Sequence, residues 1–181
     1  MRNKILSFLF FCAILICSNL AAQQKFTLSS TSFKNNDKLL PKYVSIKIPG
    51  GKNISPDMKW VNPPKDTKSF ALTCIDMAPK AKHWVHWMIF NIPLNMTHIS
   101  KGASGNDLPM GSYEALNSFG FEGYGGPQPP KKASPHKYVF TLYALNTSYI
   151  HPDKRKSDYA YFMSLIKGKI IKKTSIECFY K

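Results

Sequence analysis

Serine and histidine side chains offer this 181-residue chain its first candidates for chemistry, but their spacing suits neither hydrolysis nor metal binding. Ser104 lies in Gly-Ala-Ser-Gly at 102–105, which lacks the outer glycine of a serine-hydrolase nucleophile elbow. His83 and His86 are three residues apart, which suits a metal pair on a helix but puts the side chains on opposite faces of a strand. The chain has no phosphate-binding loop and no zinc-protease motif. We therefore expect no catalytic residue, no metal site and no cofactor.

Strands are the elements that must position any site in this chain. Residues 43–48 alternate apolar and polar side chains, as a half-buried strand does, before Pro49-Gly50-Gly51 ends the pattern. Residues 70–75 and 87–92 are apolar on both faces, which predicts two interior strands. Residues 138–145 predict a fourth strand and residues 174–180 a closing strand. Strict alternation would also place Trp84 and Trp87 on opposite faces of their strand.

One helix is predicted near the C-terminus. Apolar residues recur with helical spacing from Tyr159 to Ile166, Ser157 or Asp158 can cap the start, and Gly168 can end the helix. Many strands with one late helix predict a mainly β fold, a sheet sandwich with a few peripheral helices.

The stretch from residue 95 to residue 134 is polar and rich in glycine and proline. Structureless connections of that length are uncommon in compact domains unless they are functional. We therefore expect part of the functional site there.

The N-terminus has the pattern of an export signal. Arg2 and Lys4 precede an apolar run that is too short to span a bilayer, and small residues follow at 21–22. Residues 1–22 are predicted to be a signal peptide cleaved before Gln23, so the protein is expected to be secreted or periplasmic. Residues 23–181 then form a single domain.

The predicted mature chain is basic and retains two cysteines. Removal of Arg2 and Lys4 lowers the net charge from +15 to +13, which favours acidic partners. The lysines are scattered and no recognition motif accompanies them, so no nucleic acid is expected. Cys74 and Cys178 could form a disulfide or stay as two buried thiols, and the sequence leaves both open.

Five segments, in the right order, resemble the phosphatidylethanolamine-binding protein family, and most closely its bacterial Raf-kinase-inhibitor-like branch. Residues 53–60 resemble its N-x-S-P-x-x-x-W segment, and residues 68–79 with 84–87 resemble its first signature, a strand followed by D-P-D-A-P. Residues 123–130 and 135–138 resemble its second signature, G-x-x-P-P followed by H-R-Y-x-F, with Lys137 in place of the arginine. The resemblance implies a β-sandwich with a small anion-binding pocket near one end.

The resemblance also implies which residues line that pocket. They are Asp76, Pro79, Trp84 and His86 from the first signature, and Gly126, Pro130, His136 and Tyr138 from the second. In such a pocket, imidazole N–H groups and a tyrosine hydroxyl can donate to an anion, and a glycine turn can bring backbone N–H groups close to it. The carboxylate of Asp76 can orient a histidine or accept a hydrogen bond from an amine of the ligand.

We expect a binding protein for a small anion or phospholipid head group rather than an enzyme. One alternative is a regulator that inhibits a partner enzyme, such as a kinase or protease, through the pocket rim. Another is a weak hydrolase in which Asp76 and His86 activate water. A protein partner, peripheral contact with an anionic membrane and a homodimer stay open as further interactions.

Overall fold

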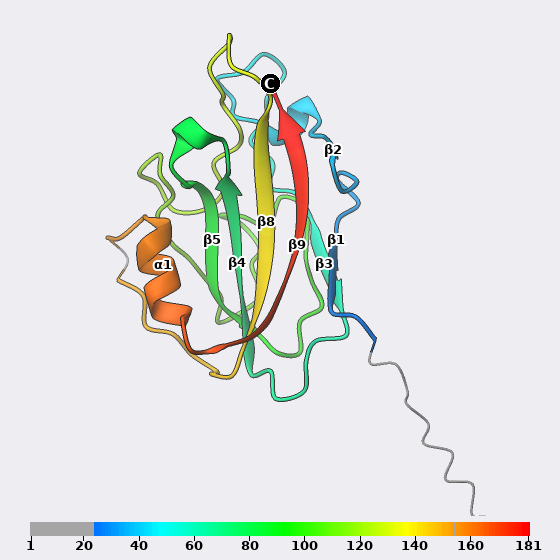
Figure 1. Cartoon of the computed structure of the whole chain (residues 1–181), viewed down its shortest axis with the longest axis vertical. Helices are drawn as coiled ribbons and strands as arrows, with labels where there is room; N and C mark the ends of the chain where they lie inside the picture. Colours follow the sequence, from blue (N-terminus) through cyan, green and yellow to red (C-terminus); the bar gives the residue numbers. More distant parts are fainter. Residues whose placement is uncertain (1–23, 154) are drawn as a thin grey trace, which may run out of the picture.

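The computed structural model describes residues 24–153 and 155–181, and their strands form two sheets (Figure 1). The larger sheet has six strands in the order β2-β9-β8-β4-β5-β7, and the smaller sheet has three in the order β1-β3-β6. The strands are β1 (Thr27–Ser29), β2 (Asp37–Lys38), β3 (Met58–Val61), β4 (Ser69–Asp76), β5 (Trp84–Pro93), β6 (His98–Ile99), β7 (Tyr113–Glu114), β8 (His136–Leu145) and β9 (Ile170–Tyr180). Neighbouring strands are antiparallel except β2 and β9.

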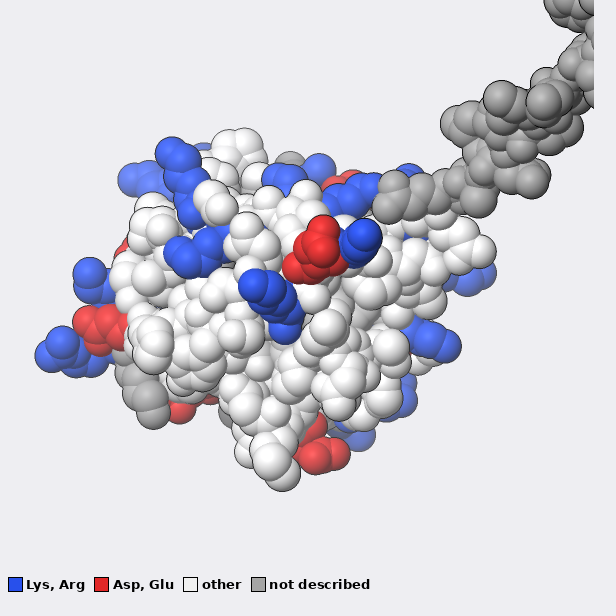
Figure 2. All heavy atoms as spheres, turned by 90° about the horizontal axis from the view of Figure 1, so that it is seen from below, with Lys and Arg blue, Asp and Glu red and all other residues white. Residues whose placement is uncertain are grey.

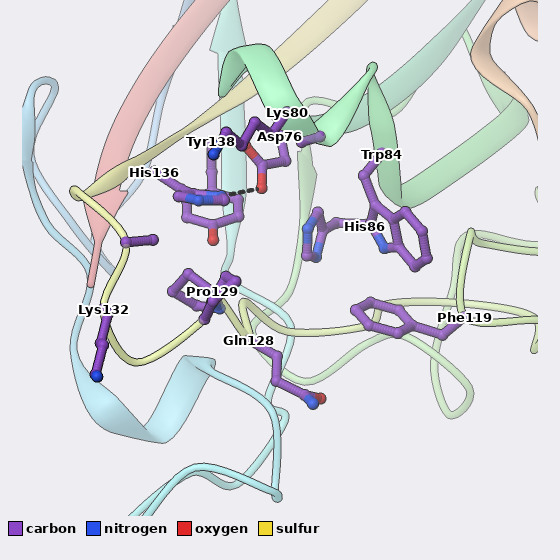
Figure 3. A pocket seen from close by; sticks show the side chains of 13 residues that line it. Asp76, Lys80, Trp84, His86, Phe119, Gln128, Pro129, Lys132, His136 and Tyr138 are labelled. Atoms are coloured by element: carbon purple, nitrogen blue, oxygen red, sulfur yellow. Dashed lines mark hydrogen bonds and ion pairs between the residues drawn. The ribbon is translucent and has the colours of Figure 1, made fainter.

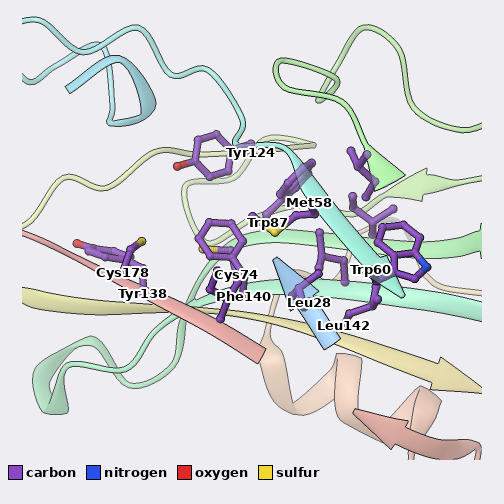
Figure 4. Close-up of a cluster of buried hydrophobic side chains, with 14 of the residues drawn as sticks. Leu28, Met58, Trp60, Cys74, Trp87, Tyr124, Tyr138, Phe140, Leu142 and Cys178 are labelled. Atoms are coloured by element: carbon purple, nitrogen blue, oxygen red, sulfur yellow. The ribbon is translucent and has the colours of Figure 1, made fainter. Parts of the chain in front are cut away.

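Strand β4 is apolar on both faces because each face of the larger sheet packs against a different layer. All eight residues of β4 are buried. One face contributes to a core shared with the small sheet, where Trp60 of β3 belongs to the same cluster as Trp87 and Phe140 (Figure 4). The other face packs under α1 (Tyr159–Ile166), with Phe162 4.9 Å from the ring of Phe90. The predicted mainly β sandwich and its interior strands are confirmed.

Helix α1 forms where the sequence predicts it, and its caps are visible. The carboxylate of Asp158 accepts a 2.7 Å hydrogen bond from the Tyr161 N–H, and Gly168 beyond the helix has φ +79°. Phe162 and Ile166 are the buried residues that hold α1 against the sheet. The other helical segments in the described part of the chain are two 3₁₀ turns, Pro41–Tyr43 and Pro79–Ala81.

The predicted strand at residues 43–48 is wrong. The segment consists of the end of the 3₁₀ turn at Pro41–Tyr43 followed by tight turns, with Ile48 N–H bonded to Ser45 O at 2.9 Å. Its alternating pattern arises because Tyr43 and Val44 are buried by tertiary contacts while Ile46 is 73% exposed. The closing strand, in contrast, is present and begins at Ile170, four residues earlier than predicted.

Two expectations from the sequence concern the N-terminus and the cysteines. The predicted signal peptide, residues 1–22, lies outside the described residues. Within the described ranges, no helix has the length and apolar character needed to cross a membrane.

Cys74 and Cys178 are both free and buried. They lie on β4 and β9 with β8 between them, so two strand spacings separate their Cα atoms by at least about 10 Å, beyond the roughly 7 Å that a disulfide can bridge.

Candidate functional site

A cavity of about 510 Å³ lies at the end of the large sheet where β4 ends and β8 begins (Figure 3). Six of the eight residues predicted for the site line it, namely Asp76, Trp84, His86, Pro130, His136 and Tyr138. The lining also includes Lys80, Ala81, Phe119, Gln128, Pro129, Lys132 and Ala133. The cavity therefore combines the two signature segments with part of the long 95–134 stretch.

Strand register brings the first group of these side chains together. Asp76, the last residue of β4, pairs with Trp84 of β5 on one side and with Tyr138 of β8 on the other. Side chains of directly paired residues lie on the same face of an antiparallel sheet, so all three point toward the cavity. His86 lies two residues after Trp84 on β5, and His136 lies two residues before Tyr138 on β8. Both side chains therefore reach the same face.

A β-bulge in β5 corrects the expected placement of the two tryptophans. The β4–β5 ladder shifts between Cys74 and Ile75, so that Cys74 pairs with Trp87 while Asp76 pairs with Trp84. Because Cys74 and Asp76 share one face of β4, both tryptophans lie on that face rather than on opposite faces. Trp87 is fully buried in the core, whereas Trp84 is 39% exposed at the cavity.

Asp76 orients one of the two histidines. Its Oδ2 lies 2.6 Å from His136 Nδ1, and its Oδ1 accepts a 2.8 Å hydrogen bond from the Ala78 N–H. The aspartate is only 5% exposed, and both of its oxygens are engaged. Because the carboxylate accepts from Nδ1–H, Nε2 of His136 is left for a ligand, where it can donate when the ring is protonated.

His86 has a different partner and therefore a different chemistry. Its Nδ1 lies 2.5 Å from the carbonyl oxygen of Gly125, and since a carbonyl only accepts, Nδ1 carries the hydrogen. Burial lowers the pKa of His86 to about 4, although the bond to Gly125 opposes the shift. The ring is neutral near pH 7, so its Nε2 is an acceptor there. The sequence-based expectation that His86 donates to an anion does not hold for this tautomer.

Aromatic rings build the walls between these polar groups. The Tyr138 ring lies 5.0 Å from His86 in an edge-on arrangement and 6.4 Å from His136 in a stacked one. Its hydroxyl is buried and has no hydrogen-bond partner among the described residues, and burial raises its pKa, so it stays protonated. Phe119 meets both Trp84 and His86 edge-on, at 5.3 and 5.4 Å.

Two predicted site residues lie outside the cavity lining. The Gly126 N–H donates to Asn53 Oδ1 at 2.6 Å, and the preceding Gly125 N–H donates to His86 O at 2.8 Å. Neither N–H is free for an anion; the turn instead packs against residues 43–45. Pro79 is exposed and starts the 3₁₀ turn whose next residues, Lys80 and Ala81, line the cavity.

The main lining residues that the sequence analysis did not predict are two lysines, Lys80 and Lys132, and one aromatic residue, Phe119. Lys80 and Lys132 lie at different sides of the cavity in Figure 3, and Phe119 closes a third side. Lys132 is exposed at the edge of the cavity. The signal for Phe119 was its position in the long 95–134 segment, although nothing local distinguishes it from Phe121. Among the described residues, no group of three or more His, Cys, Asp or Glu side chains is arranged to hold a metal ion.

Comparison with known proteins identifies relatives of this chain. The family described as "Phosphatidylethanolamine-binding protein" matches residues 29–181. The UPF0098 protein YbcL of Escherichia coli is 38% identical over 73% of this chain and 75% of its own length. A UPF0098 protein of Methanothermobacter thermautotrophicus is 37% identical over 72% of this chain and 84% of its own length.

Structural comparison also identifies YbcL. The crystal structure of E. coli YbcL, described as a member of the mammalian PEBP family, aligns with a TM-score of 0.81 and 34% identity. The alignment covers 87% of this chain and 99% of that structure. A more distant relative, the candidate lipoprotein LppC of Mycobacterium tuberculosis, is 31% identical over 68% of this chain and 57% of its own length.

Proposed function

Since this chain belongs to the phosphatidylethanolamine-binding protein family and to its bacterial branch related to YbcL, we propose that its cavity binds a small phosphate-containing anion or phospholipid head group. The observation that carries the proposal is the charge arrangement of the cavity. The one carboxylate in the lining, Asp76, is held by His136 and the Ala78 N–H, while Lys80 and Lys132 add two positive charges. An anion is thus attracted, and a cation is repelled.

The neutral groups of the cavity favour a ligand that both accepts and donates hydrogen bonds. Nε2 of a protonated His136 can donate, whereas Nε2 of neutral His86 can only accept. A phosphate ester with a protonated oxygen or an attached ammonium supplies both kinds of group. Phosphoethanolamine-type head groups therefore match the donor and acceptor set better than a fully deprotonated inorganic anion.

We propose binding without turnover. None of the described residues that line the cavity is serine, threonine or cysteine, and Asp76 is committed to orienting His136. Of the two histidines, His86 gains a proton only near pH 4, too low for a general base that must cycle near neutral pH. Incubation with chromogenic phosphate and acyl esters should therefore give no product above background.

Trp84 provides a direct readout of binding. Of the three tryptophans, Trp60 and Trp87 are at most 1% exposed, while Trp84 is 39% exposed and lines the cavity. Titration with glycerophosphoethanolamine should change the intrinsic fluorescence in a saturable way, and the change should vanish in Trp84→Phe while calorimetry still detects binding. A flat titration by both methods, with phosphate as well as with the diester, would refute the proposal.

Anion binding is expected to weaken as pH rises from 5 to 8. A bound anion favours the protonated imidazole, so by linkage the anion binds more tightly where the ring is protonated. His86 stays neutral over this range, so it contributes nothing to this dependence. The ligand for this test should be a phosphodiester, whose own charge is constant in the window. Flat affinity would assign the binding to the lysines and Tyr138 instead.

We also propose that the protein is exported. The N-terminal pattern at residues 1–22 supports this, as does the name of the mycobacterial relative, a candidate lipoprotein and hence an envelope protein. N-terminal sequencing of material from the cell envelope or medium should begin at or near Gln23. Exported material that still carries Met1 would argue against cleavage.

A further inference from the structure

A second cavity adjoins the first and shares part of its wall. It has a volume of about 760 Å³ and lies between the N-terminal turn of α1 and the start of β5 (Figure 1). Lys80, Ala81 and Trp84 line both cavities. Each volume is within the range of small-molecule pockets, about 300–1,000 Å³. Because the two cavities meet at these residues, a ligand in the first can extend past Trp84 into the second.

One wall of the second cavity is a single run of chain, residues 80–84. In an extended strand, neighbouring side chains point to opposite faces, so such a run would not line one cavity. Here Lys82 and His83 have φ of 49° and 60°, in the left-handed region that few non-glycine residues adopt. The turn that these angles make lets both side chains line the same cavity. Two such residues in succession are strained, and strain of this kind is concentrated at functional segments such as ligand clamps.

Most of the polar groups around the second cavity are hydrogen-bond donors. Lys80 and Lys82 are positively charged, and neither forms an ion pair with a carboxylate of the described residues. The Ser118 hydroxyl accepts a 2.8 Å hydrogen bond from the Val85 N–H, so its own hydrogen stays available to a ligand. The imidazole of His83 adds a further N–H donor. This set of donors suits a group that only accepts, such as a phosphate.

The one carboxylate in the lining of the second cavity belongs to the wall that α1 provides. Asp158 caps α1, where it accepts a 2.7 Å hydrogen bond from the Tyr161 N–H. Tyr159, Ala160 and Met163 line the same wall without adding a charge. Two lysines against one aspartate leave the lining with a net positive charge. An anionic group is therefore attracted to the side of residues 80–84 and repelled from the start of α1.

We propose that the second cavity is a subsite for a second anionic group, so that a small ligand with two phosphate groups on a short linker binds across both cavities. The inference rests on the proposed function of the first cavity, which holds one phosphate beside His136. The other phosphate accepts hydrogen bonds from Lys82 and Ser118. Lys80 and Trp84, which line both cavities, flank the linker.

The test compares ligands that differ only in the second phosphate. Propanediol, butanediol and hexanediol bisphosphates, and the alkanol monophosphates of the same lengths, are titrated calorimetrically into the protein at one fixed pH. For at least one length, the bisphosphate should bind about tenfold or more tightly than its monophosphate, as expected for an added hydrogen bond to a charged group. Equal affinities within every pair would overturn the inference while the proposed function of the first cavity stands. If neither class of ligand binds, the proposed function itself fails.

Lys82→Asn should remove this gain and leave the affinity for the monophosphates unchanged, because Lys82 lines only the second cavity. Asparagine adopts the left-handed region more readily than most residues, and retained monophosphate binding shows that the fold persists. Lys65→Asn, at an exposed lysine outside both cavities, removes the same charge and should keep the full gain. A gain that survives in Lys82→Asn would place the second phosphate elsewhere. A gain lost equally in Lys65→Asn would assign it to net charge, and either result would overturn the inference.

Discussion

Two histidines on either side of one tyrosine have unlike roles because their partners differ. His136 donates to a carboxylate that is itself held in place, whereas His86 donates to a backbone carbonyl and is 2% exposed. The first can bind an anion through a protonated Nε2, and the second can accept a hydrogen bond from a ligand through its neutral ring. A single residue type thus provides both a donor and an acceptor in one small cavity.

Replacement of His136 by alanine should weaken binding of glycerophosphoethanolamine by about 10- to 100-fold, as expected for loss of a hydrogen bond to a charged group. The variant also leaves the Asp76 carboxylate without its partner, which adds repulsion of the anion. Calorimetric titration measures the effect, and an unchanged circular dichroism spectrum shows that the fold persists. His151→Ala, at an exposed position outside the cavity, should bind as the parent does. Equal affinity of His136→Ala and parent would place the ligand elsewhere.

The stability of the protein should fall between about pH 6.5 and pH 4 because of His86. In the unfolded chain this histidine gains a proton near pH 6.5, but burial delays protonation in the folded protein to about pH 4. The unfolded state therefore binds more protons in this window, so the free energy of unfolding rises with pH. The rise is complete above about pH 6.5. The contribution amounts to roughly 3 kcal/mol.

Urea unfolding at a series of pH values measures this contribution. His86→Gln should show a shallower fall in stability below pH 6.5 than the parent, because glutamine does not titrate. His151→Gln, at an exposed position, is the control and should keep the parent's slope. Parallel curves for His86→Gln and parent would mean that His86 is not the titrating group.

At the scale of elements, a glycine that looked like part of an anion cradle instead joins two loops. A Cβ at Gly126 would lie 2.6 Å from Ser45 N and 2.6 Å from Tyr43 O, both backbone atoms. The same turn is fixed by the bond from the Gly126 N–H to Asn53. This close approach holds the 127–130 segment, and so the prolines of the cavity wall, against the rest of the molecule.

Gly126→Ala should therefore lower the free energy of unfolding by about 2 kcal/mol or more, because backbone must move to admit the methyl group. Thermal and urea unfolding measure the change. Gly105→Ala is a useful comparison, since nothing lies within 4 Å of its Cβ and only its φ of +70° opposes substitution. That variant should lose about 1 kcal/mol. An equal loss in the two variants would show that the approach at Gly126 is not tight.

At the scale of the whole molecule, the two sheets bury both cysteines in places from which they cannot meet. Burial raises the pKa of the Cys178 thiol to about 12 and that of Cys74 well above its ordinary value. Such thiols are neither nucleophilic nor accessible. The fold thus needs no disulfide, whatever the redox state of its compartment.

A thiol reagent should consequently react with neither cysteine in the folded protein that begins at Gln23, and with two per chain after denaturation. The thermal midpoint should be the same with and without reductant. One reactive thiol in the folded state would indicate local opening of β9, and a reductant-dependent midpoint would indicate a covalent link that this arrangement of strands does not allow.

On the end of the molecule opposite the C-terminus, the positive charge is spread rather than gathered (Figure 2). Seen from the end opposite the C-terminus, lysine and arginine side chains are scattered around the face with acidic side chains among them (Figure 2). The charges that bear on the proposed ligand are the local ones, Lys80 and Lys132 at the cavity. Net charge therefore indicates the sign of the partner but does not locate it.

The sequence by itself determined the long strands of the larger sheet, the helix and much of the cavity. Strands β4, β5 and β8 and helix α1 were predictable because periodic burial leaves a local pattern in the chain. Signature segments identified Asp76, His86 and His136 because their order along the chain is that of the family. The prediction of a strand at residues 43–48 was wrong, because the burial of these residues comes from distant loops and not from a sheet.

Tertiary structure alone decided which groups face one another. The bulge in β5 depends on how that strand pairs with β4. The pairing of Asp76 with His136 rather than His86 and the hydrogen on His86 Nδ1 depend on residues 60 and 39 apart in the chain. The same holds for Lys80, Lys132 and Phe119, which no local pattern marks as cavity residues. Periodicity reports how deeply a residue is buried, whereas the partner of a polar group is fixed only when distant strands and loops pack together.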